Sequence, residues 1–187
     1  GSLTADGMAE RLALIDPVIK YEDIADADMV IEAVFEEMPV KKEVFAKLDA
    51  VMKEGAIMAS NTSTLDIDEI ASATKRPEAV LGMHFFSPAN VMKLLEIVRG
   101  EKSSKEAVAT ALKVARRIGK VGAVCGNCDG FLANRSRMPF QTEMNILIED
   151  GALPEQVDKV MVDFGYPVGP FVVGDMSGLD IGYAVRK

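Results

Sequence analysis

The sequence predicts an α/β domain with a doubly wound, mainly parallel sheet, followed by part of a domain made of helices alone. Up to about residue 126, short apolar runs alternate with longer segments of helical character, which is typical of βαβ units. From residue 131 onward, apolar residues recur at helical spacing and no strand pattern returns. We therefore expect a first domain over residues 1–126, a second over residues 127–187, and the boundary between them at residues 126–130.

The expected strands are short apolar segments, several of them rich in β-branched residues. Residues 27–35 include Val30, Ile31 and Val34, and residues 56–60 form a compact apolar run directly after Gly55. Short apolar runs bounded by turn residues indicate strands that are buried in a sheet. The expected strands are residues 27–35, 56–60, 79–85, 94–98 and 122–125.

The expected helices are marked by residues that favour helix ends. Pro39 suits the first turn of one helix and Gly55 suits its end, while Gly151 ends the long helix that starts near residue 131. A turn at residues 167–170 leads into a further helix. The other helices are expected at residues 4–20, 39–53, 67–73, 105–118, 131–149 and 154–164.

Composition excludes some classes of partner. The chain has 187 residues and a net charge of −8, and an acidic protein gains nothing from attraction to a phosphate backbone, so nucleic acid is not expected. It contains no run of about 18 apolar residues, so a membrane span is not expected either. Its first residues are small and polar, without the basic start and apolar middle of a secretory signal.

The single histidine, His84, lies at the end of a predicted strand. Parallel sheets bind ligands at the carboxyl ends of their strands, so the loops after Phe35, Ser60 and Phe85 should form a cleft. An imidazole there can exchange a proton with a hydroxyl group. Glu96 interrupts an apolar run twelve residues further on, and a buried carboxylate needs a partner. We therefore expect His84 and Glu96 to form a hydrogen-bonded pair.

Other interpretations of these residues remain open. A lone histidine is often a structural residue, and a glutamate in a strand often faces solvent. Ser63, His84 and Glu96 also permit a serine-hydrolase triad, although the sequence has no G-x-S-x-G motif.

The remaining reactive and basic residues favour plain structural roles. Cys125 and Cys128 form one C-x-x-C, which permits a redox pair or half of a metal site, but free thiols are favoured because no second pair or histidine is near. Basic side chains on the predicted helices are most simply solvated. Lys41 and Lys42 lie near the predicted cleft, so they could also contact a phosphate group of a ligand. The basic residues are Lys41, Lys42, Arg116, Arg117 and Lys120.

Six ordered motifs give the chain a resemblance to a known family. Their order and spacing resemble those of the 3-hydroxyacyl-CoA dehydrogenases, and they span nearly the whole chain. The final residues, 178–187, are most similar to the dehydrogenase part of multifunctional enzymes that carry an enoyl-CoA hydratase domain upstream. The six motifs are residues 30–36, 59–64, 82–88, 91–97, 129–135 and 165–170.

The resemblance implies a catalytic set. In it, His84 is the general base that takes the 3-hydroxyl proton, and Glu96 holds and polarises the imidazole. Ser63 hydrogen-bonds the substrate oxygen, and Asn134, from the helical domain, helps to bind the acyl thioester.

The resemblance also implies NAD as the cofactor, bound by a Rossmann-like domain, and a 3-hydroxyacyl-CoA or 3-ketoacyl-CoA as the substrate. Glu36 and Lys41 match positions that contact NAD, and the Ser63 loop borders the nicotinamide. Ser87 stands where several members have Asn near the nicotinamide, which changes the geometry of one contact. No metal ligands are implied. The location implied is cytoplasmic in a bacterium and peroxisomal in a eukaryote.

The start of the chain departs from the family pattern. The family begins with a strand, a G-x-G-x-x-G turn and a helix whose N-terminus approaches the pyrophosphate, and this sequence contains no G-x-G-x-x-G. The family's helical domain also continues past the position of Lys187. The expectation is therefore a truncated NAD-binding domain, lacking that segment, followed by the start of the helical domain.

The reaction expected from the resemblance is oxidation of an L-3-hydroxyacyl-CoA by NAD in fatty-acid β-oxidation. One alternative is a 3-hydroxybutyryl-CoA dehydrogenase, which shares the motifs. An alternative of another class is a non-catalytic structural or dimerising module, because the family's helical domain builds homodimers.

These 187 residues alone are expected to bind NAD weakly and to turn over little. Losing two or three charge-assisted contacts to the pyrophosphate and adenosine weakens binding by about a hundredfold to a millionfold. Calorimetric titration with NADH, beside a version extended upstream through the G-x-G-x-x-G segment, measures the difference. Equal, micromolar affinity in both proteins would contradict the expectation.

Overall fold

The computed structural model describes residues 3–177. Contacts between Cα atoms divide the chain into two compact units, Gly1–Phe131 and Leu132–Lys187. The first unit contains a sheet and its covering helices, and the second contains helices in the described part, so the α/β fold followed by a helical part that the sequence predicted is confirmed.

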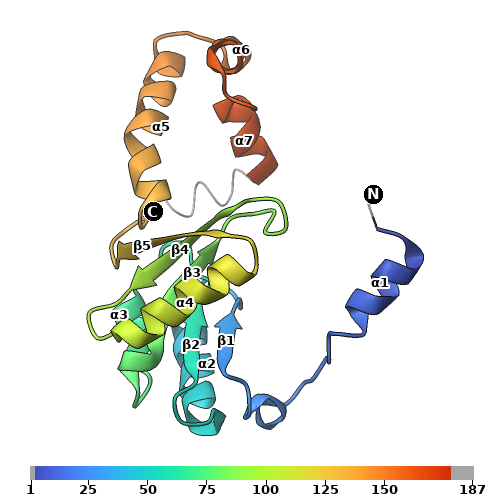
Figure 1. Cartoon of the computed structure of the whole chain (residues 1–187). Helices are drawn as coiled ribbons and strands as arrows, with labels where there is room; N and C mark the ends of the chain where they lie inside the picture. Colours follow the sequence, from blue (N-terminus) through green and yellow to red (C-terminus); the bar gives the residue numbers. More distant parts are fainter. Residues whose placement is uncertain (1–2, 178–187) are drawn as a thin grey trace. The chain divides into compact units, whose positions relative to one another are not determined.

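The sheet of the first unit has five strands in the order β1-β2-β3-β4-β5 (Figure 1). β1, β2 and β3 run parallel, β4 is antiparallel to β3, and β5 is parallel to β4. The carboxyl ends of β1 to β3 and the amino ends of β4 and β5 therefore lie at one end of the sheet, called here the ligand end. The strands are β1 (Met29–Glu32), β2 (Ile57–Ser60), β3 (Val80–Phe85), β4 (Leu94–Arg99) and β5 (Val121–Gly126).

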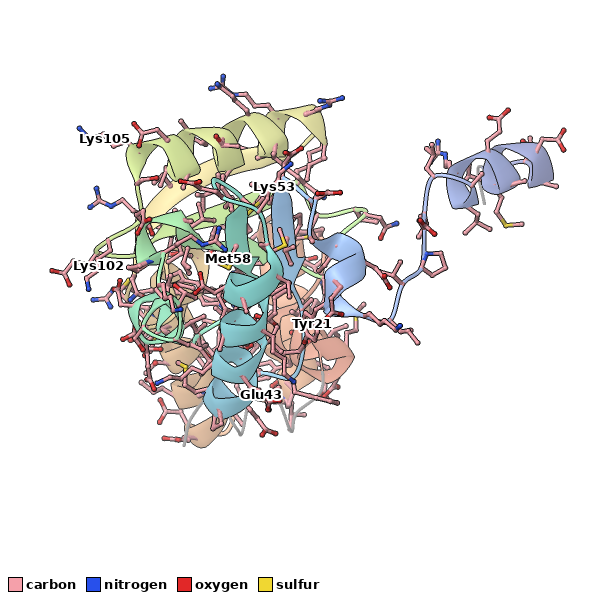
Figure 2. All side chains as sticks on the ribbon, turned by 90° about the horizontal axis from the view of Figure 1, so that it is seen from below. Tyr21, Glu43, Lys53, Met58, Lys102 and Lys105 are labelled. Carbon is pink, nitrogen blue, oxygen red and sulfur yellow. The ribbon has the colours of Figure 1, made fainter. Side chains whose placement is uncertain are left out.

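Helices cover both faces of this sheet (Figure 1). On one face, α2 (Met38–Val51) and α3 (Ile67–Ala71) pack on a core that includes Phe45, Ile70 and Met58. On the other face, α4 (Lys105–Arg117) packs on Leu81 and Ile97. Met58 lies among the elements while Lys102 and Lys105 point outward (Figure 2). Two short 3₁₀ helices, Tyr21–Ile24 and Pro77–Ala79, also belong to this unit.

The sequence of α4 explains its close contact with the sheet. Its first turn is capped by Ser104, whose Oγ accepts the N–H of Ala107 at 3.1 Å. Ala107, Ala111 and Ala115 are all buried and recur every four residues, so they form a stripe of small side chains along one face. A helix with such a stripe can approach the strands closely.

The first predicted helix is shorter than expected. Residues 4–20 were predicted to be helical, but α1 ends at Leu12 and spans Ala5–Leu12. Pro17 disfavours helical geometry in the residue before it. No residue of α1 is buried, and Leu14 and Ile15 are 86% and 65% exposed, so no packing offsets that penalty.

Gly82 is required where β3 pairs with β4, because it lies directly opposite Val98. A Cβ added there would lie 2.8 Å from the Cβ of Val98 and 3.1 Å from Cδ1 of Ile67, both on rigid elements. Gly82→Ala should therefore lower the free energy of unfolding by about 1–3 kcal/mol, as measured by urea denaturation. Gly126→Ala is the matched control, since nothing lies within 4 Å of its added Cβ. Equal stability of the two variants would contradict the packing.

The segment that leaves β5 is fastened to α3 by Asn127. Its amide nitrogen donates to Asp66 Oδ1 at 2.6 Å and Asp68 Oδ2 at 2.7 Å, and its oxygen accepts the N–H of Ile67 at 3.2 Å. The Asn127 hydrogen bond is the main cause that lowers the pKa of Asp66 below its usual value. The side chain thus holds the connecting segment and the N-terminus of α3 together.

Asn127→Ala should make the unit less stable at neutral pH, with a smaller loss in acid. A lowered folded-state pKa contributes stability above the carboxyl's unfolded pKa, and that contribution disappears as the pH falls through the folded pKa. Thermal unfolding at neutral and acidic pH, compared between wild type and variant, measures this difference. A stability gap that is the same at both pH values would contradict the role of the Asp66 contact.

The second unit contains three helices in its described part: α5 (Ala133–Glu149), α6 (Pro154–Phe164) and α7 (Pro170–Ser177). The rings of Phe140 and Tyr166 stack with centroids 5.8 Å apart, and Asp158 accepts the N–H groups of Phe171 and Val172 at the start of α7. The C-terminal motif at residues 178–187 lies outside the described residues. Within residues 3–177, no helix is both long enough and apolar enough to cross a membrane.

Candidate active site

The candidate site lies at the ligand end of the sheet, where the polar residues singled out in the sequence follow three parallel strands. Glu36 lies just beyond β1, Ser63 follows β2, and His84 lies near the end of β3. The parallel pairing of β1, β2 and β3 brings their carboxyl ends to the same place.

His84 and Glu96 form a buried pair. They are direct partners in the antiparallel register of β3 and β4, so both side chains emerge on the same face of the sheet. His84 Nδ1 lies 2.6 Å from a carboxylate oxygen of Glu96. His84 is 5% exposed and Glu96 is fully buried. The contact that the sequence predicted is therefore present.

This contact determines which ring nitrogen is available for chemistry. A carboxylate beside Nδ1 favours the tautomer that carries its proton there, which leaves the Nε2 lone pair to accept a proton from a substrate. The Phe86 ring lies 4.5 Å from the imidazole between centroids, and the Phe131 ring packs against it at 5.9 Å, nearly edge-on. The ring is thus held by one hydrogen bond and two aromatic contacts.

Phe131 has an unusual backbone conformation for its position. Its φ is 45°, in the left-handed region that residues other than glycine rarely adopt. Its side chain is only 2% exposed and belongs to the core under α2 and α3. We expected the long helix to begin at residue 131, but Phe131 packs with the first unit and α5 begins at Ala133.

Glu36 holds the loop that carries Ser63. One carboxylate oxygen of Glu36 accepts the Thr62 hydroxyl at 2.5 Å and the backbone N–H of Ser63 at 2.7 Å. Ser63 itself is exposed, so its hydroxyl is accessible at the ligand end. The loop is therefore fixed by its backbone while the serine side chain is available to a ligand.

Lys41 is not on a solvated helix face, contrary to the simplest interpretation of the sequence. Its side chain is fully buried, with Nζ 2.8 Å from Glu32 and 3.3 Å from Glu36. The acidic partners at the end of β1 explain how the charge is accommodated. Sequence reasoning missed Glu32 as a site residue, although a carboxylate within a buried strand needs a partner for the same reason as Glu96.

Lys120, also expected to be solvated, holds the loop that contains Ser87. Its ammonium donates to the carbonyls of Ala89 and Met92. Ser87 is exposed and precedes Pro88 through a cis peptide bond. Asn134 belongs to the second unit, where it is half-buried in the first turn of α5.

Neither Cys125 nor Cys128 forms a disulfide bond in the part of the chain that the structure describes. Cys125 Sγ lies 3.9 Å from the carbonyl of Ile97, and Cys128 Sγ lies 3.5 Å from that of Phe131. In the part of the chain that is described, no three His, Cys, Asp or Glu side chains are grouped as metal ligands.

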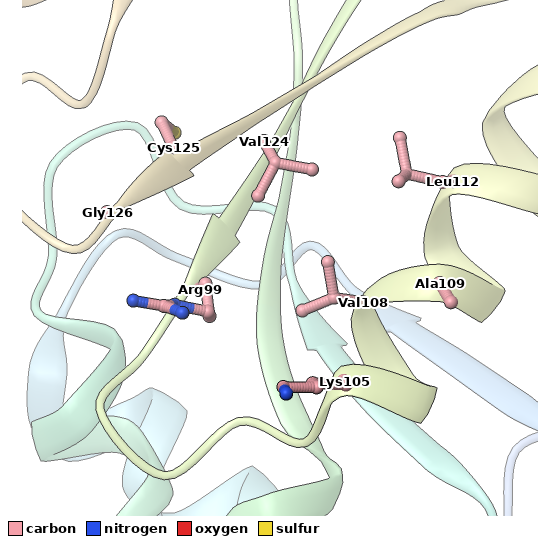
Figure 3. Close-up of a pocket in the computed structure, with 8 residues that line it drawn as sticks. All are labelled: Arg99, Lys105, Val108, Ala109, Leu112, Val124, Cys125 and Gly126. Carbon is pink, nitrogen blue, oxygen red and sulfur yellow. The ribbon is translucent and has the colours of Figure 1, made fainter.

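A surface hollow of about 380 Å³ lies between α4 and β5 (Figure 3). Its lining contains no member of the His84 and Glu96 pair and none of the Glu36 network, so it is separate from the candidate site. The lining residues are Arg99, Lys105, Val108, Ala109, Leu112, Val124, Cys125 and Gly126.

Fold and site together define a class: a doubly wound α/β protein with a carboxylate-held histidine at the end of the sheet where such folds bind ligands. Residues 1–128 match the model of the 3-hydroxyacyl-CoA dehydrogenase NAD binding domain, and residues 130–187 match the model of the C-terminal domain of the same family. The chain therefore belongs to the 3-hydroxyacyl-CoA dehydrogenase family.

Individual relatives agree with this assignment. The chain is 49% identical over 181 residues to a peroxisomal bifunctional enzyme of Danio rerio, covering 97% of this chain and 25% of that protein. It is 45% identical over 180 residues to a fatty acid oxidation complex subunit alpha of Acinetobacter baylyi, covering 96% and 25% respectively. The chain thus spans about a quarter of the length of these curated relatives.

Solved structures share the fold. The 3-hydroxybutyryl-CoA dehydrogenase of Escherichia coli matches with a TM-score of 0.91 at 38% identity, over 99% of this chain and 40% of that one. The dehydrogenase part of multifunctional enzyme 1 from C. elegans matches with a TM-score of 0.70 at 34% identity, over 98% and 43%.

Proposed function

We propose that this chain is the dehydrogenase part of an enzyme that oxidises an L-3-hydroxyacyl-CoA to the 3-ketoacyl-CoA with NAD. The observation that carries the proposal is the buried His84 and Glu96 pair, 2.6 Å apart at the ligand end of the sheet. The family assignment supports it, because the matching model is that of an NAD-binding domain.

The residues act on the proton of the 3-hydroxyl group. His84 Nε2 accepts that proton while the C3–O bond becomes a carbonyl. Glu96 faces the positive charge that develops on the imidazole and keeps Nε2 directed at the oxygen. When bound, NAD accepts the hydride that leaves C3.

The Ser63 hydroxyl and the Asn134 amide have binding roles in this proposal. Ser63 donates to the reacting oxygen, whose negative charge grows as the proton leaves. Asn134, from the helical unit, binds the acyl thioester. Both groups are accessible, since Ser63 is exposed and Asn134 is half-buried.

The ligand end also suits the nicotinamide part of NAD. Glu36 is 40% exposed at its side chain and offers carboxylate oxygens, and Ser63 and Ser87 offer hydroxyls. Phe35, which is 80% exposed just beyond β1, supplies apolar surface for a flat ring. The Lys41 side chain is fully buried, with its ammonium 3.3 Å from Glu36. Its contribution to cofactor binding therefore acts through Glu36.

A second candidate is a dehydrogenase selective for short substrates. It is favoured by the likeness to the Escherichia coli 3-hydroxybutyryl-CoA dehydrogenase. Comparing kcat/KM for acetoacetyl-CoA and for longer 3-ketoacyl-CoA thioesters separates this candidate from a β-oxidation enzyme of broad chain length.

We further propose that the helical unit contributes to a homodimer. We also propose that the protein works in the peroxisome of a eukaryote or in the cytoplasm of a bacterium, since its relatives include a peroxisomal bifunctional enzyme and a bacterial fatty acid oxidation complex subunit alpha. Several apolar side chains of α5 and α6 are exposed within the unit, including Met138, Val160 and Phe164. Light scattering after size exclusion determines the mass in solution.

The proposal is tested by oxidation of NADH with acetoacetyl-CoA, using the protein at the full length encoded by its gene. Loss of NADH absorbance that requires both reactants supports the proposal. No turnover by a folded, full-length protein would contradict it and favour a structural or dimerising role.

A further inference from the structure

Glu32 is a buried carboxylate whose two oxygens are both engaged. It lies at the last position of β1 and is 4% exposed. One oxygen accepts the N–H of Val34 at 2.6 Å and Lys41 Nζ at 2.8 Å, while the other accepts the Ser60 hydroxyl at 2.7 Å and Lys41 Nζ at 3.1 Å. Such complete pairing is what a carboxylate needs to remain buried.

Lys41 connects this buried carboxylate to a second one at the surface. Its fully buried ammonium lies 2.8 Å from Glu32 and 3.3 Å from Glu36, so two carboxylates share one cation. The hydrogen-bonded contact is the one with Glu32. The negative charge of Glu32 therefore weakens the attraction between the Lys41 ammonium and Glu36. The Glu36 carboxylate can then accept hydrogen bonds from other groups.

Glu36 uses that freedom to hold the Ser63 loop. Its Oε1 accepts from Thr62 and from the Ser63 backbone, while its Oε2 faces Lys41. The contacts run without interruption from Glu32 through Lys41 and Glu36 to Ser63. This series is called here the Glu32 relay.

We propose that Glu32 is a positioning residue for cofactor binding, which acts through Lys41 to hold Glu36 and the Ser63 loop in the arrangement that receives the nicotinamide. The proposal rests on the proposed function above. If Glu32 loses its charge, the ammonium is attracted to Glu36 alone, and the Glu36 carboxylate turns away from Thr62 and Ser63.

The first test is Glu32→Gln, which keeps the shape of the side chain and can still accept from Val34. The expected result is a rise of about tenfold to a hundredfold in the Kd and KM for NADH, the range of one charge-assisted contact. The KM for acetoacetyl-CoA should change by less than about threefold. The kcat should fall by less than the KM for NADH rises, although it will fall to some extent because Ser63, whose loop moves, also donates to the reacting oxygen. A merely structural ion pair would alter the melting temperature without this selective change.

The matched control is Glu43→Gln, on α2, the helix that also carries Lys41. Glu43 pairs with Lys47 at 2.6 Å on the surface, where its side chain is 68% exposed, so its loss should change no kinetic constant. Glu36→Gln, at a half-exposed site that tolerates the change, should reproduce the selective rise for NADH. The Glu36→Gln variant provides the test if Glu32→Gln fails to fold. An unchanged affinity for NADH in Glu36→Gln would overturn the proposed role of the Glu32 relay.

A double-mutant cycle tests whether Glu32 acts through Lys41. Lys41→Met and the Glu32→Gln/Lys41→Met double variant should have similar Kd values for NADH, because the relay is already broken in the single variant. Independent, additive effects would overturn the proposal, as would an unchanged Kd in Glu32→Gln. NADH binding is followed by its fluorescence, so a wild type that binds NADH but reduces no acetoacetyl-CoA would contradict the proposed function alone.

Discussion

Replacing His84 by glutamine should lower kcat for NADH-dependent reduction of acetoacetyl-CoA by about a hundredfold to ten-thousandfold, the range that general acid–base catalysis contributes. Glutamine is close in size to histidine and can still bond to Glu96, but it cannot exchange a proton. The Kd for NADH should remain within about threefold, since His84 acts on the substrate oxygen. Steady-state kinetics and NADH fluorescence measure the two quantities.

The structure offers a control for packing at the same place. Phe86 touches the imidazole with centroids 4.5 Å apart but has no group that can accept or donate a proton. Phe86→Leu keeps an apolar wall and should lower kcat by much less than His84→Gln. If His84→Gln retained more than about a tenth of the wild-type kcat in a folded protein, His84 would not be the base.

Replacing Glu96 by glutamine should lower kcat by an amount that approaches the loss in His84→Gln. An amide at this position donates its N–H to Nδ1 and so favours the tautomer with the proton on Nε2, where no base function remains. In serine proteases the corresponding exchange of a carboxylate for an amide costs about ten-thousandfold in kcat. Because the side chain volume is kept, the Kd for NADH and the melting temperature should change little.

The double variant His84→Gln/Glu96→Gln tests whether His84 and Glu96 act as one unit. Residues that act as one unit are strongly non-additive, so the double variant should be no slower than the slower single variant by more than about threefold. Glu96→Asp, which keeps the charge but shortens the reach, should recover part of the rate. Full activity of Glu96→Gln would mean that the 2.6 Å contact is structural only.

Much of the fold could be predicted from local patterns. The predicted helix at residues 154–164 agrees with α6, because Pro154 and Gly165 mark its two ends. The predicted strands lie within a few residues of β1 to β5, since short apolar runs are a strong local signal. The contact of His84 with Glu96 was also predictable, because a carboxylate in an apolar strand requires a partner and the chain has one imidazole.

Other features depend on contacts between distant residues. The charge of Lys41 indicated a solvated helix face. Its ammonium can be buried because Glu32, at the end of β1, lies 2.8 Å from it. The helix predicted to continue to residue 20 ends at Leu12, since local apolar spacing does not reveal whether a face is covered. The left-handed φ of Phe131 follows from its packing in the core of the first unit, which no local pattern encodes.

In the proposed reaction, hydride passes between the nicotinamide and C3 of the acyl-CoA while His84 carries the proton. This reaction is tested most directly with NADH deuterated at the transferable position of C4, acetoacetyl-CoA and the full-length protein, with mass spectrometry of the product. We expect one deuterium at C3 of 3-hydroxybutyryl-CoA in wild type, and a product yield at least about a hundredfold lower over the same time in His84→Gln. Unlabelled product from wild type, or labelled product formed equally fast by His84→Gln, would contradict the proposed reaction.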